Sequence, residues 1–137
     1  MSYLLDTNVI SEIARTRPDN NVIKWFQSVP DDSLHLSVLT LGEIRKGVEK
    51  IKENERKEKL RLWLEHDLLV WFANRILPIN EQVADKWGRL QNHAGRPIPA
   101  IDSLIAATAL HYDLRLVTRN GQDFQHPGLE IINPWDN

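Results

Sequence analysis

The chain of 137 residues contains no cysteine, so disulfides, thiolate metal sites and cysteine nucleophiles are all excluded. It also lacks any uncharged stretch near the roughly 20 residues that a helix needs to cross a bilayer. Its first residues, Met1 to Asp6, lack the basic region and the long apolar run of a signal peptide. These absences predict a cytoplasmic protein that makes no contact with a membrane.

An excess of positive charge is missing as well, because the formal net charge is −2. This balance argues against a protein that coats nucleic acid by bulk attraction. The basic residues are nevertheless concentrated: eight of the seventeen lie between Arg45 and Arg61, with four glutamates among them. Two interpretations stay open for this segment, a solvated helical face stabilised by i,i+4 pairs or a ridge that contacts phosphates or a partner.

Short apolar runs alternate along the chain with segments of helical periodicity. Expected strands are residues 3–5, 34–38, 76–79, 114–117 and 129–132. Helical spacing covers 9–13, 22–28, 40–51, 60–72, 83–94 and 101–109, with a charged turn at 52–56 and a stop at 95–97. This alternation predicts an α/β layer fold with a mainly parallel sheet. The length fits one domain, which we expect to span residues 1–137.

Three acidic residues stand where their apolar neighbours would not ordinarily call for a charge. Asp6 closes the first predicted strand, Glu43 lies in an otherwise apolar helical turn, and Asp102 interrupts the apolar start of a helix. Half-buried carboxylates are costly unless they are paired or bind a metal. In a parallel sheet, ligands collect at the carboxyl ends of the strands, and all three acids can reach that edge.

Each acid also has a purely structural interpretation. Asp6 could be only a helix cap, Asp102 only a first-turn residue favoured by the helix dipole, and Glu43 only a surface residue. Taken together, the three favour a hard-oxygen site, which suits Mg²⁺ or Mn²⁺ rather than Zn²⁺. Such an ion activates water and neutralises charge on a scissile phosphate. The five histidines show no metal-ligand spacing.

Four sequence motifs resemble those of the PIN-domain family, and of VapC-type toxins within it. They are Leu-Leu-Asp-Thr-Asn-Val-Ile-Ser (4–11), Ser-Val-Leu-Thr-Leu-Gly-Glu-Ile (37–44), Ile-Pro-Ala-Ile-Asp-Ser-Leu-Ile-Ala-Ala-Thr-Ala (98–109) and Val-Thr-Arg-Asn-Gly-Gln-Asp-Phe (117–124). Each motif is weak alone, but all four occur in the family order. The resemblance spans the chain and implies a three-layer PIN-like fold.

The resemblance also implies a set of site residues. Asp6 and Asp102 would be direct ligands of Mg²⁺ or Mn²⁺, and Glu43 would bind the metal or position the attacking water. The fourth acidic position is open between Asn120 and Asp123. Thr7, Asn8 and Thr118 would orient the carboxylates, although capping or strand-end roles are equally open for Asn8 and Thr118.

The activity that the resemblance implies is metal-dependent cleavage of RNA by the toxin of a toxin–antitoxin pair. A cognate antitoxin protein and a homodimer are implied as well. A non-enzymatic alternative is a PIN-like module that binds a protein or RNA partner, against which the intact acids count. A phospho-accepting receiver domain is disfavoured, because Asp6-Thr7-Asn8 has no adjacent acid and no lysine ends the fourth strand.

Two further groups of residues could take part in binding. Arg45, Lys46 and Arg119 lie near the acids in sequence and could contact phosphates. Four tryptophans lie on apolar faces and are expected in the core or at a dimer contact rather than stacked on RNA: Trp25, Trp63, Trp71 and Trp87. Trp135, which follows Pro134, is left open.

Overall fold

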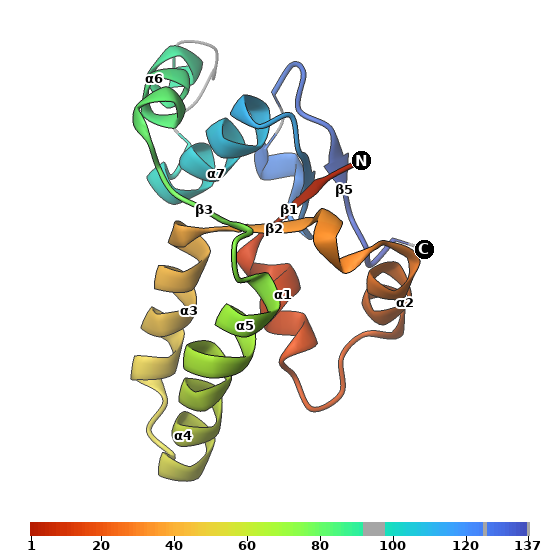
Figure 1. Ribbon diagram of the computed structural model, residues 1–137, viewed down its shortest axis with the longest axis vertical. Coiled ribbons are helices and arrows are strands. Elements are labelled where there is room, and N and C mark those ends of the chain that lie inside the picture. Colours follow the sequence, from red (N-terminus) through yellow and green to blue (C-terminus); the bar gives the residue numbers. More distant parts are fainter. Residues whose placement is uncertain (92–97, 125, 137) are drawn as a thin grey trace.

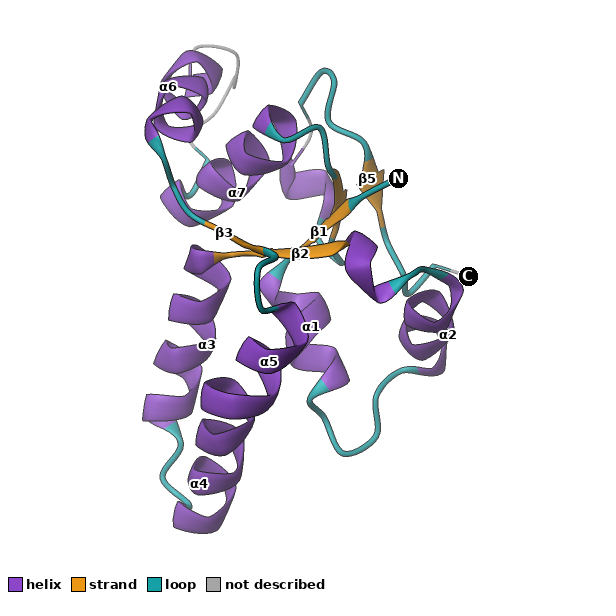
Figure 2. Ribbon diagram, in the orientation of Figure 1, coloured by secondary structure: helices purple, strands orange, loops and turns teal. Residues whose placement is uncertain are grey.

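In the computed structural model, which describes residues 1–91, 98–124 and 126–136, a central sheet separates two layers of helices (Figure 2). The described residues form five strands in the order β3-β2-β1-β4-β5. Their bounds are β1 Tyr3–Leu5, β2 Leu34–Ser37, β3 Ile76–Leu77, β4 Arg115–Val117 and β5 Ile131–Ile132. Every pairing is parallel, so the predicted parallel α/β fold is confirmed.

Helices cover both faces of the sheet (Figure 1). On one face lie α1 (Thr7–Ile13), α2 (Asn20–Ser28), α3 (Val38–Lys50), α4 (Asn54–Leu62) and α5 (Leu69–Phe72). On the other face lie α6 (Glu81–Leu90) and α7 (Ala100–His111). Residues Trp63–Leu68, between α4 and α5, form a π-helical segment. None of the helices in the described ranges is long and apolar enough to span a membrane.

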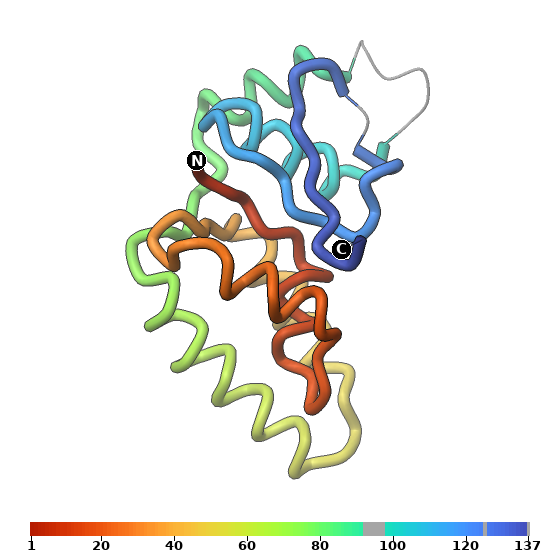
Figure 3. Tube along the Cα trace, turned by 90° about the vertical axis from the view of Figure 1, so that its right-hand side faces the viewer, coloured from red at the N-terminus to blue at the C-terminus, as the bar shows by residue number. Residues whose placement is uncertain are grey.

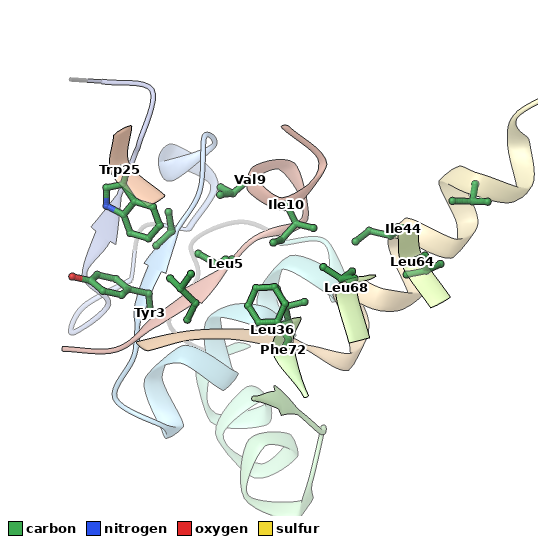
Figure 4. Packing of buried hydrophobic residues seen from close by; sticks show 13 residues of the cluster. Tyr3, Leu5, Val9, Ile10, Trp25, Leu36, Ile44, Leu64, Leu68 and Phe72 are labelled. Carbon is green, nitrogen blue, oxygen red and sulfur yellow. The ribbon is translucent and has the colours of Figure 1, made fainter. Parts of the chain in front are cut away.

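The alternation of side chains along the central strands produces two cores. Tyr3 and Leu5 of β1 pack with α1, α2, α3 and the helical segment 63–72, together with Leu36 of β2 (Figure 4). Leu4 faces the opposite way and packs with Leu116 and the α7 residue Ile105. Because successive strand residues point to opposite faces, a strand of three residues serves both layers.

The structure moves some of the predicted boundaries. Val38 opens α3 instead of ending β2, because the Ser37 hydroxyl accepts a hydrogen bond from the Leu39 amide at 3.0 Å and caps the helix. The strands predicted at 76–79 and 129–132 are shorter, and the charged turn predicted at 52–56 is confined to residues 51–53. The predicted helix stop at 95–97 lies outside the described residues.

The C-terminal segment lies beside α2 (Figure 3). After β5, the Trp135 carbonyl accepts a hydrogen bond from Asn21 Nδ2 in α2 at 2.9 Å. The Trp135 amide donates to Asn133 Oδ1 at 2.9 Å, which folds the segment back on itself. The C-terminal segment is thereby fixed beside the helix that follows β1 and α1.

Candidate active site

Asp6 follows β1 directly and is 6% exposed. Both of its oxygens accept hydrogen bonds: Oδ1 from the Thr7 amide at 2.8 Å, and Oδ2 from the Thr118 hydroxyl at 2.8 Å. The expected capping role at α1 is therefore real, but the bond from Thr118 after β4 adds a long-range contact. Burial raises the pKa of Asp6, the bonds from Thr118 and Thr7 oppose this, and the nearby charge of Glu43 raises it further.

Thr118 and Asn8 join the ends of the two central strands around this carboxylate. Asn8 Nδ2 donates to Asp6 Oδ2 and to Thr118 Oγ1, each at 3.4 Å. Thr118 is fully buried, and its hydroxyl also accepts a hydrogen bond from the Asn120 amide at 3.1 Å. These contacts fix the direction in which Asp6 presents its carboxylate, and they give Asn8 and Thr118 more than a strand-end role.

Glu43 lies in the second turn of α3 and is half-buried. Its Oε1 accepts a hydrogen bond from the Thr7 hydroxyl at 2.5 Å, and the same hydroxyl lies 3.3 Å from Oγ1 of the buried Thr40. Thr7 thus links α1 to α3 and holds Glu43 beside Asp6. Sequence analysis did not identify Thr40; its position, one helical turn before Glu43 on the same face, is the signal that could have found it.

Asp102 lies in the first turn of α7 and is half-buried. Its pKa is raised to about 6, first by burial and then by the negative charges of Asp6, Glu43 and Asp123. The effect of three separate carboxylates on one group places them in a common electrostatic environment. These acids come from the junction of β1 and α1, from α3, from α7 and from the 3-10 helix after β4, so the fold brings together residues that are far apart in sequence.

Asn120 and Asp123 occupy the turn after β4. Both are exposed, and the backbone amide of Asp123 donates to the Asn120 carbonyl at 2.9 Å at the start of a 3-10 helix, Gly121–Phe124. Of the two, only Asp123 carries a charge, and that charge acts on Asp102.

Carboxylate oxygens of this kind are the ligands that Mg²⁺ and Mn²⁺ prefer, and the raised pKa of Asp102 shows the repulsion that a cation would relieve. Among the residues that the structure describes, however, no three acidic or histidine side chains converge closely enough to hold an ion as they stand. The donor chemistry therefore fits a divalent cation, which would have to draw the carboxylates together.

Two arginines of the basic segment, one in α3 and one in α4, form ion pairs with nearby glutamates. Arg45 pairs with Glu65 at 2.7 Å and with Glu49 at 3.6 Å. Arg61 pairs with Glu65 at 2.8 Å and also with Glu58. For Arg45 and Arg61, the interpretation as a helical face stabilised by ion pairs is the one that the structure supports.

The tryptophans predicted to be structural lie in or against the core. Trp25 is buried, Trp63 and Trp71 pack against the same cluster, and Trp87 packs beside α7 and donates from Nε1 to the Ser103 hydroxyl at 2.8 Å. Trp135 is different: its ring lies 5.0 Å from the guanidinium carbon of Arg119.

One buried acid is not among the residues predicted from the sequence. Glu12 in α1 is as buried as Asp6, at 6% exposed. Its Oε2 accepts the backbone amide of Asp19 at 2.9 Å, and its Oε1 pairs with Arg15 at 3.2 Å. Glu12 therefore anchors the loop between α1 and α2. Glu12 lies three positions after Val9 on the buried face of α1, and this helical spacing is the signal that could have found it.

Comparison with known proteins finds relatives that match nearly the whole chain. The chain is 38% identical over 135 residues to "Toxin FitB" of Neisseria gonorrhoeae, covering 96% of this chain and 97% of the relative. It is 35% identical over 136 residues to "VapC ribonuclease Y4jK" of Sinorhizobium fredii, covering 97% of each chain.

Solved structures share the fold over nearly the whole length. The crystal structure of FitAcB from Neisseria gonorrhoeae superposes with a TM-score of 0.92 at 38% identity, covering 98% of this chain and 99% of that chain. A toxin–antitoxin complex from Klebsiella pneumoniae matches with a TM-score of 0.72 at 26% identity, covering 99% of this chain and 100% of that chain. The PIN domain family matches residues 3–128, and with these relatives at more than 30% identity, the chain belongs to the PIN domain family.

Proposed function

We propose that this chain is a metal-dependent endoribonuclease that hydrolyses phosphodiester bonds of RNA and acts as the toxin of a toxin–antitoxin pair. The observation that carries the proposal is the group of acids around Asp102, whose pKa is raised first by burial and then by the charges of Asp6, Glu43 and Asp123. A relative of nearly equal length bears the name of a VapC ribonuclease, and another bears the name of a toxin.

In this proposal, Asp6, Glu43 and Asp102 hold Mg²⁺ or Mn²⁺. Asp123 is the fourth acid in preference to Asn120, because its charge reaches Asp102 and adds to the attraction for a cation. Asn120 then serves the turn through its backbone, which bonds to Thr118 and Asp123. The carboxylates supply only oxygen ligands, which matches the chemistry of both ions.

A bound divalent cation supplies the positive charge that activates water and stabilises the phosphate during in-line attack. The protein contributes the orientation of the groups around it. Thr118 and Asn8 hold Asp6, and Thr7 fixes Oε1 of Glu43. The other oxygen of Glu43 can then bind the ion or accept a hydrogen bond from the attacking water. These hydrogen bonds reduce the reorganisation that the site needs during reaction.

We further propose that a cognate antitoxin protein binds this chain and that the chain forms a homodimer. The antitoxin is supported by the match to a toxin–antitoxin complex from Klebsiella pneumoniae. The alignment with this chain extends over 100% of the matched chain of that complex. The homodimer rests on the family resemblance. Light scattering coupled to size-exclusion chromatography tests it: a mass near twice 15.9 kDa supports the dimer, and a mass near 15.9 kDa contradicts it.

The first test is incubation of the purified chain with total RNA in Mg²⁺ or Mn²⁺. We expect discrete cleavage that EDTA abolishes and that Asp6→Asn and Asp102→Asn reduce by at least about a hundredfold, as for loss of a group that positions the metal. Asp67→Asn is the matched control, because Asp67 is an exposed acid outside the site.

Circular dichroism and Mn²⁺ titration of the same samples separate loss of fold from loss of function. A folded chain that binds Mn²⁺ and cuts no RNA, or cleavage that survives both Asp6→Asn and EDTA, would contradict the proposal. Equal loss of activity in Asp67→Asn would show that net charge rather than the site controls cleavage.

A further inference from the structure

Arg119 is an exposed cation at the edge of the carboxylate site, directly after Thr118. Its backbone amide donates to Asn8 Oδ1 at 3.3 Å, and Asn8 Nδ2 in turn donates to Asp6 Oδ2 at 3.4 Å. Two hydrogen bonds therefore connect the backbone of Arg119 to the buried carboxylate. The position of the residue relative to the site is fixed, although its side chain lies at the surface.

The guanidinium of Arg119 rests on an aromatic ring from the far end of the chain. Its Cζ lies over the Trp135 ring, 5.0 Å from the centroid, within the range of a cation–π interaction. Trp135 is held by the bond from Asn21 Nδ2 to its carbonyl and by the bond from its amide to Asn133 Oδ1. The ring is half-buried and packs against the main core, so it is a firm support for an otherwise flexible side chain.

Arg119 differs from the other arginines near the site in its electrostatic partners. Within the described part of the chain it forms no ion pair, whereas Arg45 is paired with Glu49 and Glu65. Arg119 therefore carries an unneutralised charge on the residue directly after Thr118, whose hydroxyl donates to Asp6. A guanidinium that stacks on a ring by its face keeps its N–H edges available, and those edges match a phosphate.

We infer that Arg119, supported by Trp135, is a phosphate-binding residue that seats the RNA backbone beside the carboxylate site. Arg119 contacts the substrate, and Trp135 is a positioning residue that acts through it. The inference rests on the proposed function for its substrate and goes beyond it by assigning a binding role to two residues outside the acids. A phosphodiester that approaches four carboxylates is repelled by their negative charge. A fixed positive charge on the protein reduces this repulsion in addition to what the metal ion contributes.

The test compares Arg119→Gln with Arg17→Gln, a matched charge change at an exposed arginine in the loop between α1 and α2, outside the site. Binding of a short fluorescein-labelled single-stranded RNA of mixed sequence is followed by anisotropy over a salt series. To prevent cutting, both changes are made in an Asp6→Asn background. We expect Arg119→Gln to weaken binding and to reduce the slope of log K against log salt by about 0.7, the loss of one phosphate contact.

Cleavage kinetics in the active chain supply a second measurement. Arg119→Gln should raise KM severalfold and change kcat little, because the lost contact binds the substrate in the ground and transition states alike. Trp135→Leu should shift KM in the same direction, whereas Trp135→Phe, which retains a ring under the guanidinium, should restore most of it. Arg119→Lys should lie between the wild type and Arg119→Gln, since it keeps the charge and loses the planar fork.

An unchanged salt slope and an unchanged KM in Arg119→Gln would overturn the inference, and so would an equal loss of binding in Arg17→Gln. Rescue that fails in Trp135→Phe, with the fold intact by circular dichroism, would remove Trp135 from it. A wild-type chain that binds RNA and cuts none would count against the proposed nuclease. The role of Arg119 in RNA binding would then be decided by the slopes of log K against log salt. A wild-type chain that does neither would overturn both.

Discussion

At the scale of single residues, Asp102 couples the chemistry of the site to the stability of the protein. Its pKa is raised from 3.8 to about 6 in the folded chain, so the folded state binds more protons than the unfolded state between these values. The free energy of unfolding must therefore fall as pH rises through this window. Above it, the ionised carboxylate destabilises the metal-free protein.

Replacing Asp102 by Asn should remove that cost. We expect the variant to be more stable than the wild type by about 1 kcal/mol at pH 7.5 in EDTA, after allowance for solvent screening of a half-buried group. The gain should disappear toward pH 4, where the wild-type carboxyl is protonated. Urea unfolding at both pH values measures it. A variant that is less stable at pH 7.5, or a gain independent of pH, would refute this account of the site.

Sequence analysis identified the acids of the site because each interrupts an apolar pattern. Asp6 and Asp102 lie where they were expected, at a strand end and in a first helical turn. The same reasoning missed Glu12, whose partner is the backbone amide of Asp19 across a loop. A contact made through loop conformation leaves no periodic signal, so the partner of Glu12 could not be predicted.

At the scale of elements, the junction between β2 and α3 places Glu43. Ser37 is fully buried, ends the strand and caps the helix through the bond from the Leu39 amide. Ser37→Ala should lower the free energy of unfolding by about 1 kcal/mol, as loss of a helix N-cap does. Ser11→Ala, at an exposed serine of α1, is the control. Urea titrations of both variants decide this; equal stability of Ser37→Ala and wild type would show that the cap contributes nothing.

The helix predicted for residues 60–72 is present, but it contains a π-helical turn that the pattern of apolar residues did not indicate. The buried residues Leu64, Leu68 and Phe72 recur every four positions. In an α-helix of 3.6 residues per turn, each step of four overshoots the buried face by about 40°. The π-helical segment Trp63–Leu68 has a wider turn and reduces this drift. The pattern of apolar residues shows that a face is buried but does not show which helical hydrogen bonds keep it aligned.

At the scale of the whole molecule, the alternation of strands and helices was enough to predict a parallel α/β fold, but it could not give the strand order. β1 lies at the centre and pairs with β2 on one side and β4 on the other, with Leu4 opposite His35 and Leu116. Pairing with a strand more than a hundred residues away is decided by tertiary packing. The comparison of motifs in the family order, rather than periodicity, supplied the three-layer arrangement.

This topology predicts that the first part of the chain does not fold alone. A chain of residues 1–91 would lack α7, β4 and β5, leaving β1 as an edge strand and the buried Leu4 without Leu116 and Ile105. We expect it to show no cooperative thermal transition by circular dichroism and poor dispersion in an NMR spectrum, in contrast to the full chain. A cooperative transition in this fragment would contradict the prediction.

The bond from Thr118 to Asp6 spans 112 positions of the chain. During translation, Asp6 is synthesised long before Thr118. The carboxylate of Asp6 therefore lacks the hydrogen bond from the Thr118 hydroxyl until that residue has been added and has reached its place in the fold. The carboxylate of Asp6 therefore gains its full set of hydrogen bonds only when β1 and β4 have come together, so this part of the candidate site forms late in folding rather than locally.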